Sequence, residues 1–524
     1  MSNTNKLKSF IQLLQQQFQE SSERPAIIYR NQVFTFGQLA DRVETTAAFL
    51  REKGLKKGDV VILYTPEKLP FLFIHLGIIL CGGISLPLNP NFTADEMEYF
   101  INDSGARFVF ASGEQTGVID SIKNNCPGLE TVFETDINQK FLRGPGAPRR
   151  GEPIKSFFKK RPPGRRRQIK PEDYCFMLYS SGTTGRPKGV VHTHANTAAS
   201  LLALQKCWKF SPQDVLLNVL PLYHIHGLSF ASHLSLISGS AMMVEDGFHP
   251  LKTMQKIKEA TVFMGVPTFY YAFLNRKEFK EKAKEWRRTR LFTCGSAPIR
   301  ADVLGEIEAI IGKPLINRYG MTESHVITSL PLDRPVKQGS VGLPLQGIEI
   351  KIEKSEPRTN TDKHGQSSVP VGEVLVKSPN LFHHYWRKPG ATKDAFDETG
   401  FFRTGDLGYF DEEGYLFLVG RARDLIITSG FNVYPPVVER VINEFPGIKE
   451  SAVIGIPDLL KGEKVMAVIV VQPGRSVEIS ELKKHCREKL VNYQCPVYFE
   501  IVQELPRNTI GKILKRELKE KFKT

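Results

Sequence analysis

Short apolar runs alternate with longer amphipathic segments along most of this chain, and this alternation limits the folds that it can adopt. The runs at residues 60–63 and 84–88 have the length of buried strands, and a helical pattern separates them. Similar alternation recurs at residues 106–133 and 215–330. Strand and helix in turn favour an α/β fold with largely parallel sheets.

A chain of 524 residues is longer than one core usually accommodates, so two or more domains are expected. Beyond Asp424 the chain begins a new unit with its own strand and helix patterns. We therefore predict a large N-terminal domain, residues 1–422, built of parallel-sheet α/β subdomains, and a small C-terminal α+β domain, residues 423–524. A polar stretch at residues 353–370 is predicted to form a turn between strands.

A run of glycines and hydroxyl residues between two apolar segments, residues 179–189, is suited to wrapping a polyphosphate. It reads Tyr-Ser-Ser-Gly-Thr-Thr-Gly-Arg-Pro-Lys-Gly, and the flanking residues 174–179 and 190–191 are predicted to be buried strands. Glycines let the backbone approach a ligand, hydroxyls donate to phosphate oxygens, and Lys188 adds a positive charge. It is not a Walker A loop, because Lys188 is followed by Gly189 rather than by a hydroxyl residue.

Much of the net charge of +15 lies in one segment, residues 143–170, where eleven basic residues accompany a single acid, Glu152. Glycines and prolines interrupt this segment, so we expect an exposed loop. A solvated surface is the simplest interpretation. Contact with an anionic membrane or with the phosphates of a large cofactor stays open, whereas nucleic acid is disfavoured because no binding module accompanies the charge.

The cysteine pattern and the lack of a long apolar run favour a cytoplasmic protein. The seven cysteines are scattered and never in C-x-x-C spacing, which indicates a reducing compartment and no structural zinc. Glutamines interrupt the apolar residues near the N-terminus, so no signal-peptide core is present. The longest apolar run, residues 71–80, is too short to span a membrane and is predicted to be a buried helix ended by Gly82 and Gly83.

Five further motifs accompany the phosphate loop. They are Pro-Leu-Tyr-His-Ile-His-Gly-Leu at 221–228, Gly-Ser-Ala-Pro at 295–298, Arg-Tyr-Gly-Met-Thr-Glu-Ser at 318–324, Thr-Gly-Asp-Leu-Gly at 404–408 with Gly-Arg-Ala-Arg-Asp at 420–424, and Pro-Arg-Asn-Thr-Ile-Gly-Lys at 506–512. Together they resemble the adenylate-forming superfamily of acyl-CoA synthetases, adenylation domains and luciferases, over nearly the whole chain. The resemblance implies an enzyme that joins a carboxylic acid to a thiol through an acyl-adenylate.

The resemblance also implies ATP, Mg²⁺ and coenzyme A as cofactors. It assigns the β- and γ-phosphates to Thr183, Thr184 and Lys188, the α-phosphate to Thr322, and magnesium to Glu323. It assigns the ribose hydroxyls to Asp406 with Arg421, the adenine edge to Gly295, Ser296 and Ala297, and the adenine face to the ring of Tyr319. The same motifs also contain Ser180, Ser181, Gly182 and Gly320. These assignments agree with the need for cations and hydroxyls where charge builds on the phosphates.

By the same resemblance, Lys512 catalyses adenylation, because an ammonium there can bridge the carboxylate and the α-phosphate. Thioester formation then follows rotation of the small, mobile C-terminal domain about a hinge at Arg423. Rotation brings Ser429, Gly430 and Phe431 to the pantetheine, and His224 is expected to swing with this step. The role of the neighbouring His226 stays open.

The acid is harder to assign. Arg318 precedes the Tyr-Gly-Met-Thr-Glu motif, close to where the acyl group must lie, and a guanidinium there could bind a second carboxylate of the substrate. The closest resemblance is to malonyl-CoA synthetases, at residues 264–270, 318–319 and 430–435. One departure is Ser238-Gly239-Ser240, where those enzymes carry a second substrate arginine; if these small residues face the pocket, a longer acid would fit.

Several alternatives remain open at this stage. Arg318 could pair with an internal acid while the pocket, with Gly295 and His224 beside it, takes a medium-chain fatty or aromatic monocarboxylate. An adenylation enzyme that loads a carrier protein would share every motif. A luciferase-like oxygenase and a pure scaffold fit less well. The expected partners are therefore a small carboxylic acid and CoA, and the oligomeric state is not predicted.

Overall fold

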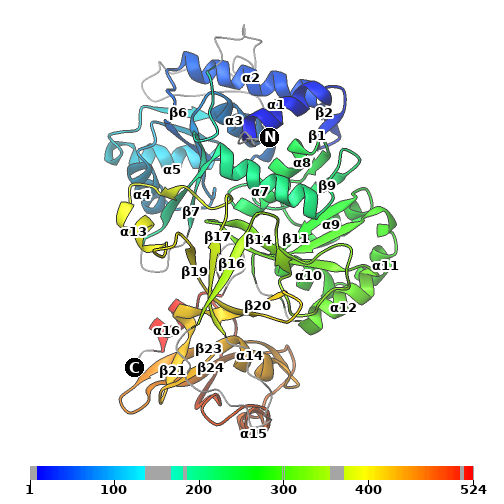
Figure 1. Ribbon diagram of the computed structural model, residues 1–524, viewed down its shortest axis with the longest axis vertical. Helices are drawn as coiled ribbons and strands as arrows, with labels where there is room; N and C mark the ends of the chain where they lie inside the picture. The colour runs from blue at the N-terminus through cyan, green and yellow to red at the C-terminus, as the bar shows by residue number, and fades with distance from the viewer. Residues whose placement is uncertain are drawn as a thin grey trace, which may run out of the picture.

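The computed structural model describes residues 9–135, 167–180, 186–297, 299, 301–354, 371–507 and 513–522. Two parallel sheets with helices around them make up the upper body of the molecule, and a small C-terminal domain lies beneath it (Figure 1). The predicted fold class, a large α/β domain followed by a small domain, is confirmed.

The first parallel sheet contains the strands on either side of the phosphate loop. Its order is β18 (His384–Tyr385), β8 (Lys188–Thr193), β7 (Tyr174–Ser180), β4 (Ile84–Pro87), β3 (Val60–Tyr64), β5 (Phe108–Ala111), β6 (Thr131–Glu134). Strands β7, β4, β3, β5 and β6 run parallel, while β8 and β18 run antiparallel to their neighbours. The predicted pair of buried strands around the loop is thus β7 and β8.

The second sheet has six parallel strands at its centre. Its order is β15 (Leu343–Pro344), β14 (His325–Ser329), β13 (Leu315–Met321), β12 (Leu291–Cys294), β11 (Val262–Gly265), β9 (Val215–Asn218), β10 (Ala241–Val244), β1 (Pro25–Tyr29), β2 (Gln32–Thr35). The run from β13 to β1 is parallel, and β14, β15 and β2 are antiparallel. Because the centre is parallel, the segments after β9, β11, β12 and β13 leave from one edge of the sheet.

A third sheet is antiparallel throughout, which the expectation of largely parallel sheets did not include. It contains β16 (Glu349–Lys354), β17 (Gly372–Lys377), β19 (Phe402–Phe410) and β20 (Leu416–Arg421). The strand predicted to resume at Gly372 is β17. Figure 1 shows this sheet between the parallel layers and the small domain.

Helices of the large domain pack around and between these sheets. They are α1 (Phe10–Glu20), α2 (Phe36–Glu52), α3 (Lys68–Leu80), α4 (Ala94–Ser104), α5 (Glu114–Ile122), η1 (Lys123–Asn125), α7 (His194–Cys207), η2 (His226–His233), α8 (Leu234–Ile237), α9 (Pro250–Ile257), α10 (Pro267–Leu274), α11 (Phe279–Ala283), η3 (Trp286–Arg288), α12 (Ala301–Ile311), α13 (Pro389–Asp394) and η4 (Ala422–Asp424).

Helix α3 is the buried helix expected from its apolar run. Every residue from Phe71 to Leu80 is buried, and its side chains join α1, α2, α7 and both parallel sheets in one hydrophobic core. Capping boxes at Thr35 and Thr93 begin α2 and α4 by satisfying free backbone N–H groups. Within the described ranges, no helix is both long and apolar enough to cross a bilayer.

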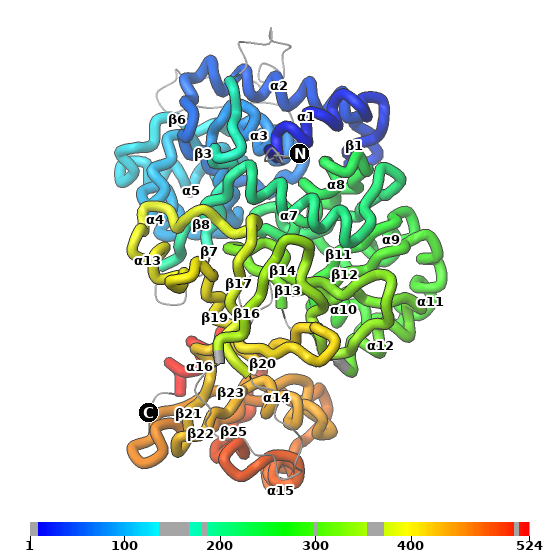
Figure 2. The backbone as a smooth tube through the Cα atoms, viewed as in Figure 1, coloured from blue at the N-terminus to red at the C-terminus, as the bar shows by residue number. Residues whose placement is uncertain are grey.

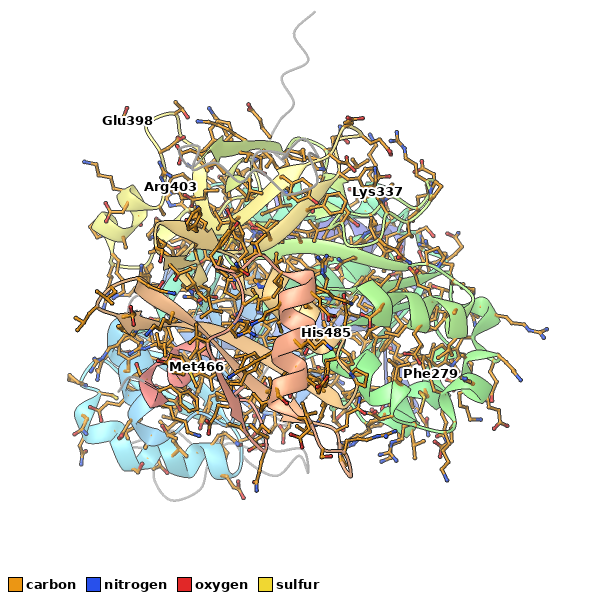
Figure 3. All side chains as sticks on the ribbon, turned by 90° about the horizontal axis from the view of Figure 1, so that it is seen from below. Phe279, Lys337, Glu398, Arg403, Met466 and His485 are labelled. Atoms are coloured by element: carbon orange, nitrogen blue, oxygen red, sulfur yellow. The ribbon has the colours of Figure 1, made fainter. Side chains whose placement is uncertain are left out.

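The small domain is a five-stranded sheet with its own core. It contains β22 (Phe431–Val433), β21 (Ile426–Thr428), β24 (Gly462–Val471), β23 (Ile448–Asp458) and β25 (Tyr498–Ile501), with α14 (Pro435–Asn443), α15 (Ile479–Lys489) and α16 (Lys515–Lys521). Figure 2 traces the chain from β20 directly into this domain. Seen from below, it lies in front of the large domain, with Met466 and His485 labelled on it (Figure 3).

Candidate active site

Ser180 and Lys188 stand opposite each other at the start of the phosphate loop, as a register pair of β7 and β8. The Ser180 hydroxyl donates a 3.1 Å hydrogen bond to Oε1 of Glu323. Glu323 lies in the turn between β13 and β14 together with Thr322, and only 8% of it is exposed. A carboxylate and a hydroxyl are oxygen ligands of the kind that Mg²⁺ prefers, so these residues fit the metal predicted here.

Tyr385 joins the same group of side chains, and the sequence motifs did not include it. Its hydroxyl donates to Glu323 Oε1 over 3.2 Å, and the Lys188 ammonium lies 5.1 Å from the centre of its ring. The only signal in the sequence is the aromatic run His-His-Tyr-Trp at residues 383–386. Nothing in that run connects it to a glutamate 62 positions earlier in the chain.

Asp406, on β19, is held between two side chains that come from different sheets. Arg421, at the end of β20, forms a 2.7 Å ion pair with Oδ1, and Tyr319 on β13 donates a 2.5 Å hydrogen bond to Oδ2. Burial opposes the positive charge of Arg421, but Asp406 and the other acidic groups around it, Tyr319, Glu323 and Asp424, together outweigh burial and raise the pKa of Arg421. Both oxygens of the Asp406 carboxylate are thus held in place by side chains of the protein.

The Tyr319 ring packs in a small hydrophobic cluster under the antiparallel sheet. Its neighbours in that cluster include Ile327, Val374 and Leu416. Burial and the Asp406 carboxylate both raise the pKa of Tyr319, so its hydroxyl stays a donor. The next residue, Gly320, faces the backbone of β14, where an added Cβ would lie 2.1 Å from the His325 carbonyl oxygen. Tyr319 therefore connects the nucleotide motif directly to Asp406.

Arg318 is buried beneath this region without a carboxylate partner among the described residues. Only 3% of it is exposed, its Nη2 donates to Ser296 Oγ over 3.3 Å, and its Cζ lies 4.9 Å from the centre of the Phe230 ring. In the described part of the chain, its Nε has no hydrogen-bond acceptor. Burial lowers the pKa of Arg318 to about 10, so the guanidinium is charged at neutral pH.

The loop after β12 brings Gly295 and Ser296 against that arginine, and Ala297 follows them. Ser296 has a positive φ of 73° and is exposed, and its hydroxyl lies 3.1 Å from Nδ1 of His226. Because Arg318 can only donate, Ser296 Oγ accepts from it and can donate to His226. Ser296 thus links the segment after β12 to the beginning of η2.

The two histidines of the Pro-Leu-Tyr-His-Ile-His motif are both neutral, and His226 lies near Arg318. Burial lowers the pKa of His224 to about 4. Burial, Arg318 and His224 together hold the pKa of His226 well below 6.5. Across the described residues, Nε2 of each ring is buried without a hydrogen-bond partner. These imidazoles can donate or accept a hydrogen bond but carry no charge.

Ser238, Gly239 and Ser240 do not line the site, which corrects the interpretation that they might leave room for a longer acid. They precede β10, at the edge opposite to the segments after β9, β12 and β13. Ser238 accepts from Gln205 of α7, Ser240 bonds Ser235, and a Cβ at Gly239 would lie 2.6 Å from Gln17 of α1.

The residues predicted to meet the thiol form an exposed turn on the small domain. Ser429 and Gly430 have φ values of 50° and 83° and connect β21 to β22, with Phe431 beginning the second strand. The Phe431 ring stacks on Tyr493 at 4.6 Å. Nothing within 4 Å would obstruct a Cβ at Gly430, so its positive φ explains the glycine.

Several predicted features lie outside the described residues. They are Ser181, Gly182, Thr183 and Thr184 of the phosphate loop, Lys512, nearly all of the basic segment, and the polar stretch between β16 and β17. Of the basic segment, Arg167 donates to the carbonyls of Cys81 and Leu55.

Comparison with known proteins identifies the family of this chain. The model of the AMP-binding enzyme family matches residues 14–386, and that of the AMP-binding enzyme C-terminal domain matches residues 437–512. A long-chain-fatty-acid–CoA ligase of Escherichia coli O157:H7 is 31% identical, with 99% of this chain and 95% of that protein aligned. The mitochondrial malonate–CoA ligase ACSF3 of Mus musculus is also 31% identical, over 95% of this chain and 88% of that protein.

Among solved structures, ATP-bound MatB from Rhodopseudomonas palustris superposes with a TM-score of 0.88 at 34% identity, over 98% of this chain and 99% of that one. The family model covers well over half of the chain, and the relatives align over nearly their full lengths. The chain therefore belongs to the AMP-binding enzyme family, and it is an acyl-CoA ligase that acts through an adenylate with ATP, Mg²⁺ and coenzyme A.

Proposed function

We propose that this ligase activates malonate or a closely related short dicarboxylic acid. The observation that carries the proposal is the charge of Arg318, which is buried and, in the described ranges, has no carboxylate of the protein to neutralise it. An unpaired buried charge is costly. A substrate that brings a second carboxylate would remove that cost when it binds.

The surroundings of Arg318 support an acid over other ligands. Phe230 presents the face of its ring to the guanidinium, so one side of the cation is packed while its N–H groups stay available. The internal acid that would make Arg318 structural is not found among the described residues. A planar guanidinium binds a carboxylate through two parallel hydrogen bonds, which suits the distal group of a short diacid.

His226 would provide a second donor to the same carboxylate. Ser296 Oγ accepts from Arg318 and can donate to Nδ1 of His226. In this proposal it does so, and the proton of His226 is on Nε2. A neutral imidazole adds a hydrogen bond without adding a second buried charge. In this proposal His226 takes the part that a second arginine plays in the malonyl-CoA synthetases that the sequence resembles.

For the nucleotide, we propose the roles expected from the motifs. The phosphate-loop residues from Ser180 to Thr184 and Lys188 would bind the β- and γ-phosphates, Thr322 the α-phosphate, and Glu323 magnesium. Asp406 would bind the ribose hydroxyls, and Gly295 to Ala297 with Tyr319 and Gly320 would border the adenine. The hydrogen bond from Ser180 to Glu323 and the ion pair of Asp406 with Arg421 support these roles.

For the two half-reactions, we propose Lys512 as the residue that stabilises the adenylation transition state. We also propose a domain boundary between residues 422 and 423, with Arg423 as the hinge of a mobile small domain. In support, β20 ends at Arg421, and the small-domain sheet begins at Ile426. Ser429, Gly430 and Phe431 would meet the pantetheine after rotation, while His224 shields or opens the thiol channel.

A second candidate is a fatty or aromatic monocarboxylate–CoA ligase. It is favoured by the long-chain-fatty-acid–CoA ligase that is as similar to this chain as the malonate–CoA ligase is. In that case Arg318 would contribute only to the architecture of the pocket. Direct measurement of acyl-CoA distinguishes a CoA ligase, which forms it, from an enzyme that loads a carrier protein instead.

We also propose a cytoplasmic location, with weak contact between the basic segment, residues 143–170, and anionic lipid. All seven cysteines are free, which suits a reducing compartment. The segment's excess of positive charge is the support for lipid contact. Liposome binding that does not depend on the content of anionic lipid would contradict it.

The deciding experiment is pyrophosphate release with ATP, Mg²⁺ and CoA across malonate, methylmalonate, succinate, acetate, hexanoate and 4-coumarate. The wild-type enzyme and Arg318→Ala are compared. Malonate or methylmalonate should give the highest kcat/KM, and the substitution should remove that preference while monoacids are little affected. If a monoacid gives the highest kcat/KM and Arg318→Ala leaves the selectivity unchanged, the second candidate replaces the dicarboxylate proposal.

A further inference from the structure

Three segments that are distant in the sequence meet at one carboxylate oxygen. Oε1 of Glu323 accepts from Ser180 at the end of β7 and from Tyr385 in β18. In the described part of the chain, the other oxygen, Oε2, accepts no hydrogen bond. One side of the carboxylate is thus occupied by neutral hydroxyl donors, and the other keeps its lone pairs for a cation.

The same tyrosine supports Lys188 through its ring. The ammonium lies 5.1 Å from the ring centre, and within the described residues it forms no ion pair with a carboxylate. A ring face attracts a cation without neutralising it. Lys188 therefore keeps its full charge for an anionic ligand, while its position is restrained.

Backbone pairing places Tyr385 rigidly. β18 pairs with β8 in the register Tyr385 with Val190, and the next residue, Trp386, donates from its backbone N to the Gly189 carbonyl over 2.7 Å. The Trp386 indole also donates to the Ser104 carbonyl at the end of α4. The backbone N–H of Tyr385 bonds Thr392 Oγ1. These bonds fix the backbone of Tyr385, whose ring and hydroxyl contact Lys188 and Glu323.

A tyrosine hydroxyl is protonated at neutral pH, so Tyr385 gives Glu323 a neutral donor. A hydroxyl donor of this kind orients a carboxylate without competing for its charge, as outer-shell partners do for metal ligands.

We infer that Tyr385 is a positioning residue for the magnesium nucleotide: its hydroxyl orients Glu323 toward the metal, and its ring holds Lys188 toward the phosphates. The inference rests on the proposed roles of Glu323 and Lys188. It predicts that the two parts of the side chain act on different ligands, the hydroxyl on the metal and the ring on the phosphates.

The test measures binding of ATP to the full chain by calorimetry, without acid or CoA, over a series of Mg²⁺ concentrations. Tyr385→Phe keeps the ring and should raise the Mg²⁺ concentration for half-maximal ATP binding about threefold to tenfold, with affinity at saturating Mg²⁺ nearly unchanged. Tyr385→Leu also removes the ring and should weaken ATP binding at saturating Mg²⁺ by a further factor of about three.

Two further variants make the outcome unambiguous. Tyr29→Phe is the matched control, because Tyr29 also donates to a carboxylate, Asp246, at a place outside the site, and it should leave the Mg²⁺ dependence unchanged. Ser180→Ala removes the other donor to Glu323 Oε1 and should shift the Mg²⁺ dependence in the same direction as Tyr385→Phe.

The possible failures are distinct. If the wild-type chain does not bind ATP with Mg²⁺, the proposed nucleotide roles are wrong. If the wild-type chain binds and Tyr385→Phe behaves as Tyr29→Phe does, the inference about Tyr385 is wrong while the proposed function stands. If Tyr385→Phe loses affinity equally at every Mg²⁺ concentration, the hydroxyl acts on the fold or on ATP itself, which also overturns the inference.

Discussion

Arg318 occupies the space that a side chain at position 295 would need. A Cβ on Gly295 would lie 2.8 Å from Cζ and 2.9 Å from Nε of the guanidinium. The glycine of the Gly-Ser-Ala motif therefore leaves room for the buried arginine.

Gly295→Ala should displace Arg318 and lower kcat/KM for malonate. Overpacking of this kind costs about 1–3 kcal/mol, which corresponds to about fivefold to more than a hundredfold. Activity on hexanoate should fall less, because it does not use the guanidinium. Gly117→Ala is the control, since Gly117 is in a helix with nothing within 4 Å of an added Cβ. Equal losses on both acids would show that position 295 serves only the nucleotide.

Arg318→Lys should keep a positive charge and still lose most of the preference for a diacid. A lysine ammonium cannot reproduce the planar pair of hydrogen bonds, so kcat/KM for malonate should drop by about tenfold or more. The preference is measured as the ratio of kcat/KM values for malonate and acetate. Arg30→Lys, at an exposed ion pair with Asp246, controls for the substitution itself. An unchanged ratio would mean that charge alone selects the acid.

His226→Phe should lower activity on malonate by removing a neutral donor, while His226→Gln should retain part of it. One hydrogen bond to a charged group is worth about 1.5–3 kcal/mol, or roughly tenfold to a hundredfold. Since the pKa of His226 lies well below 6.5, the KM for malonate should not follow a histidine titration between about pH 6 and 8. A KM for malonate that decreases as the pH falls through 6.5 would show that a cationic imidazole binds the acid.

Tyr319→Phe should weaken ATP binding by about tenfold, because Asp406 loses a hydrogen bond of 2.5 Å while keeping Arg421. Calorimetry with ATP in the absence of acid measures this directly. Tyr64→Phe removes a tyrosine bond to the Phe92 carbonyl and serves as the control. No change in ATP affinity would contradict the proposed link between Asp406 and the ribose.

The free energy of unfolding should fall as the pH drops below 6.5. Burial lowers the pKa values of His75 and His194 to about 3 and those of His224 and His325 to about 4. Between pH 6.5 and these values the unfolded chain binds protons that the folded chain does not. Each histidine then removes up to about 1.4 kcal/mol per pH unit.

Urea unfolding at pH 8, 7, 6 and 5 measures this slope. His194→Asn should reduce the loss of stability between pH 6.5 and 5, because one buried histidine no longer titrates, while substitution of the exposed His249 by Gln should not. A stability that is flat from pH 8 to 5 would show that these histidines are solvated in solution.

Local pattern was enough to predict the parallel part of the fold. The middle of β7, the two valines of β8 and the run from Phe71 to Leu80 of α3 are buried, so these stretches are mostly apolar. The antiparallel sheet was not predicted, because β17 pairs with β19 across a long intervening stretch that has no hairpin signal. Whether Ser238 to Ser240 face the pocket stayed open for a related reason, because their position along the chain did not reveal which sheet edge they occupy.

The candidate site also has a part that the sequence predicts and a part that it does not. Arg318, Glu323 and Asp406 belong to motifs whose residue types state their chemistry. The residues that contact them could not be predicted in this way. The Tyr319 hydroxyl bonds a carboxylate 87 positions away in the chain, and the Tyr385 hydroxyl bonds one 62 positions away. Such contacts depend on sheet order, which local spacing does not encode.

Arg421 is both the last residue of β20 and the cation paired with Asp406. Residue 422 begins the short η4 turn that leads into the small domain. The residue that pairs with Asp406 is therefore also the residue at which the chain leaves the antiparallel sheet for the small domain.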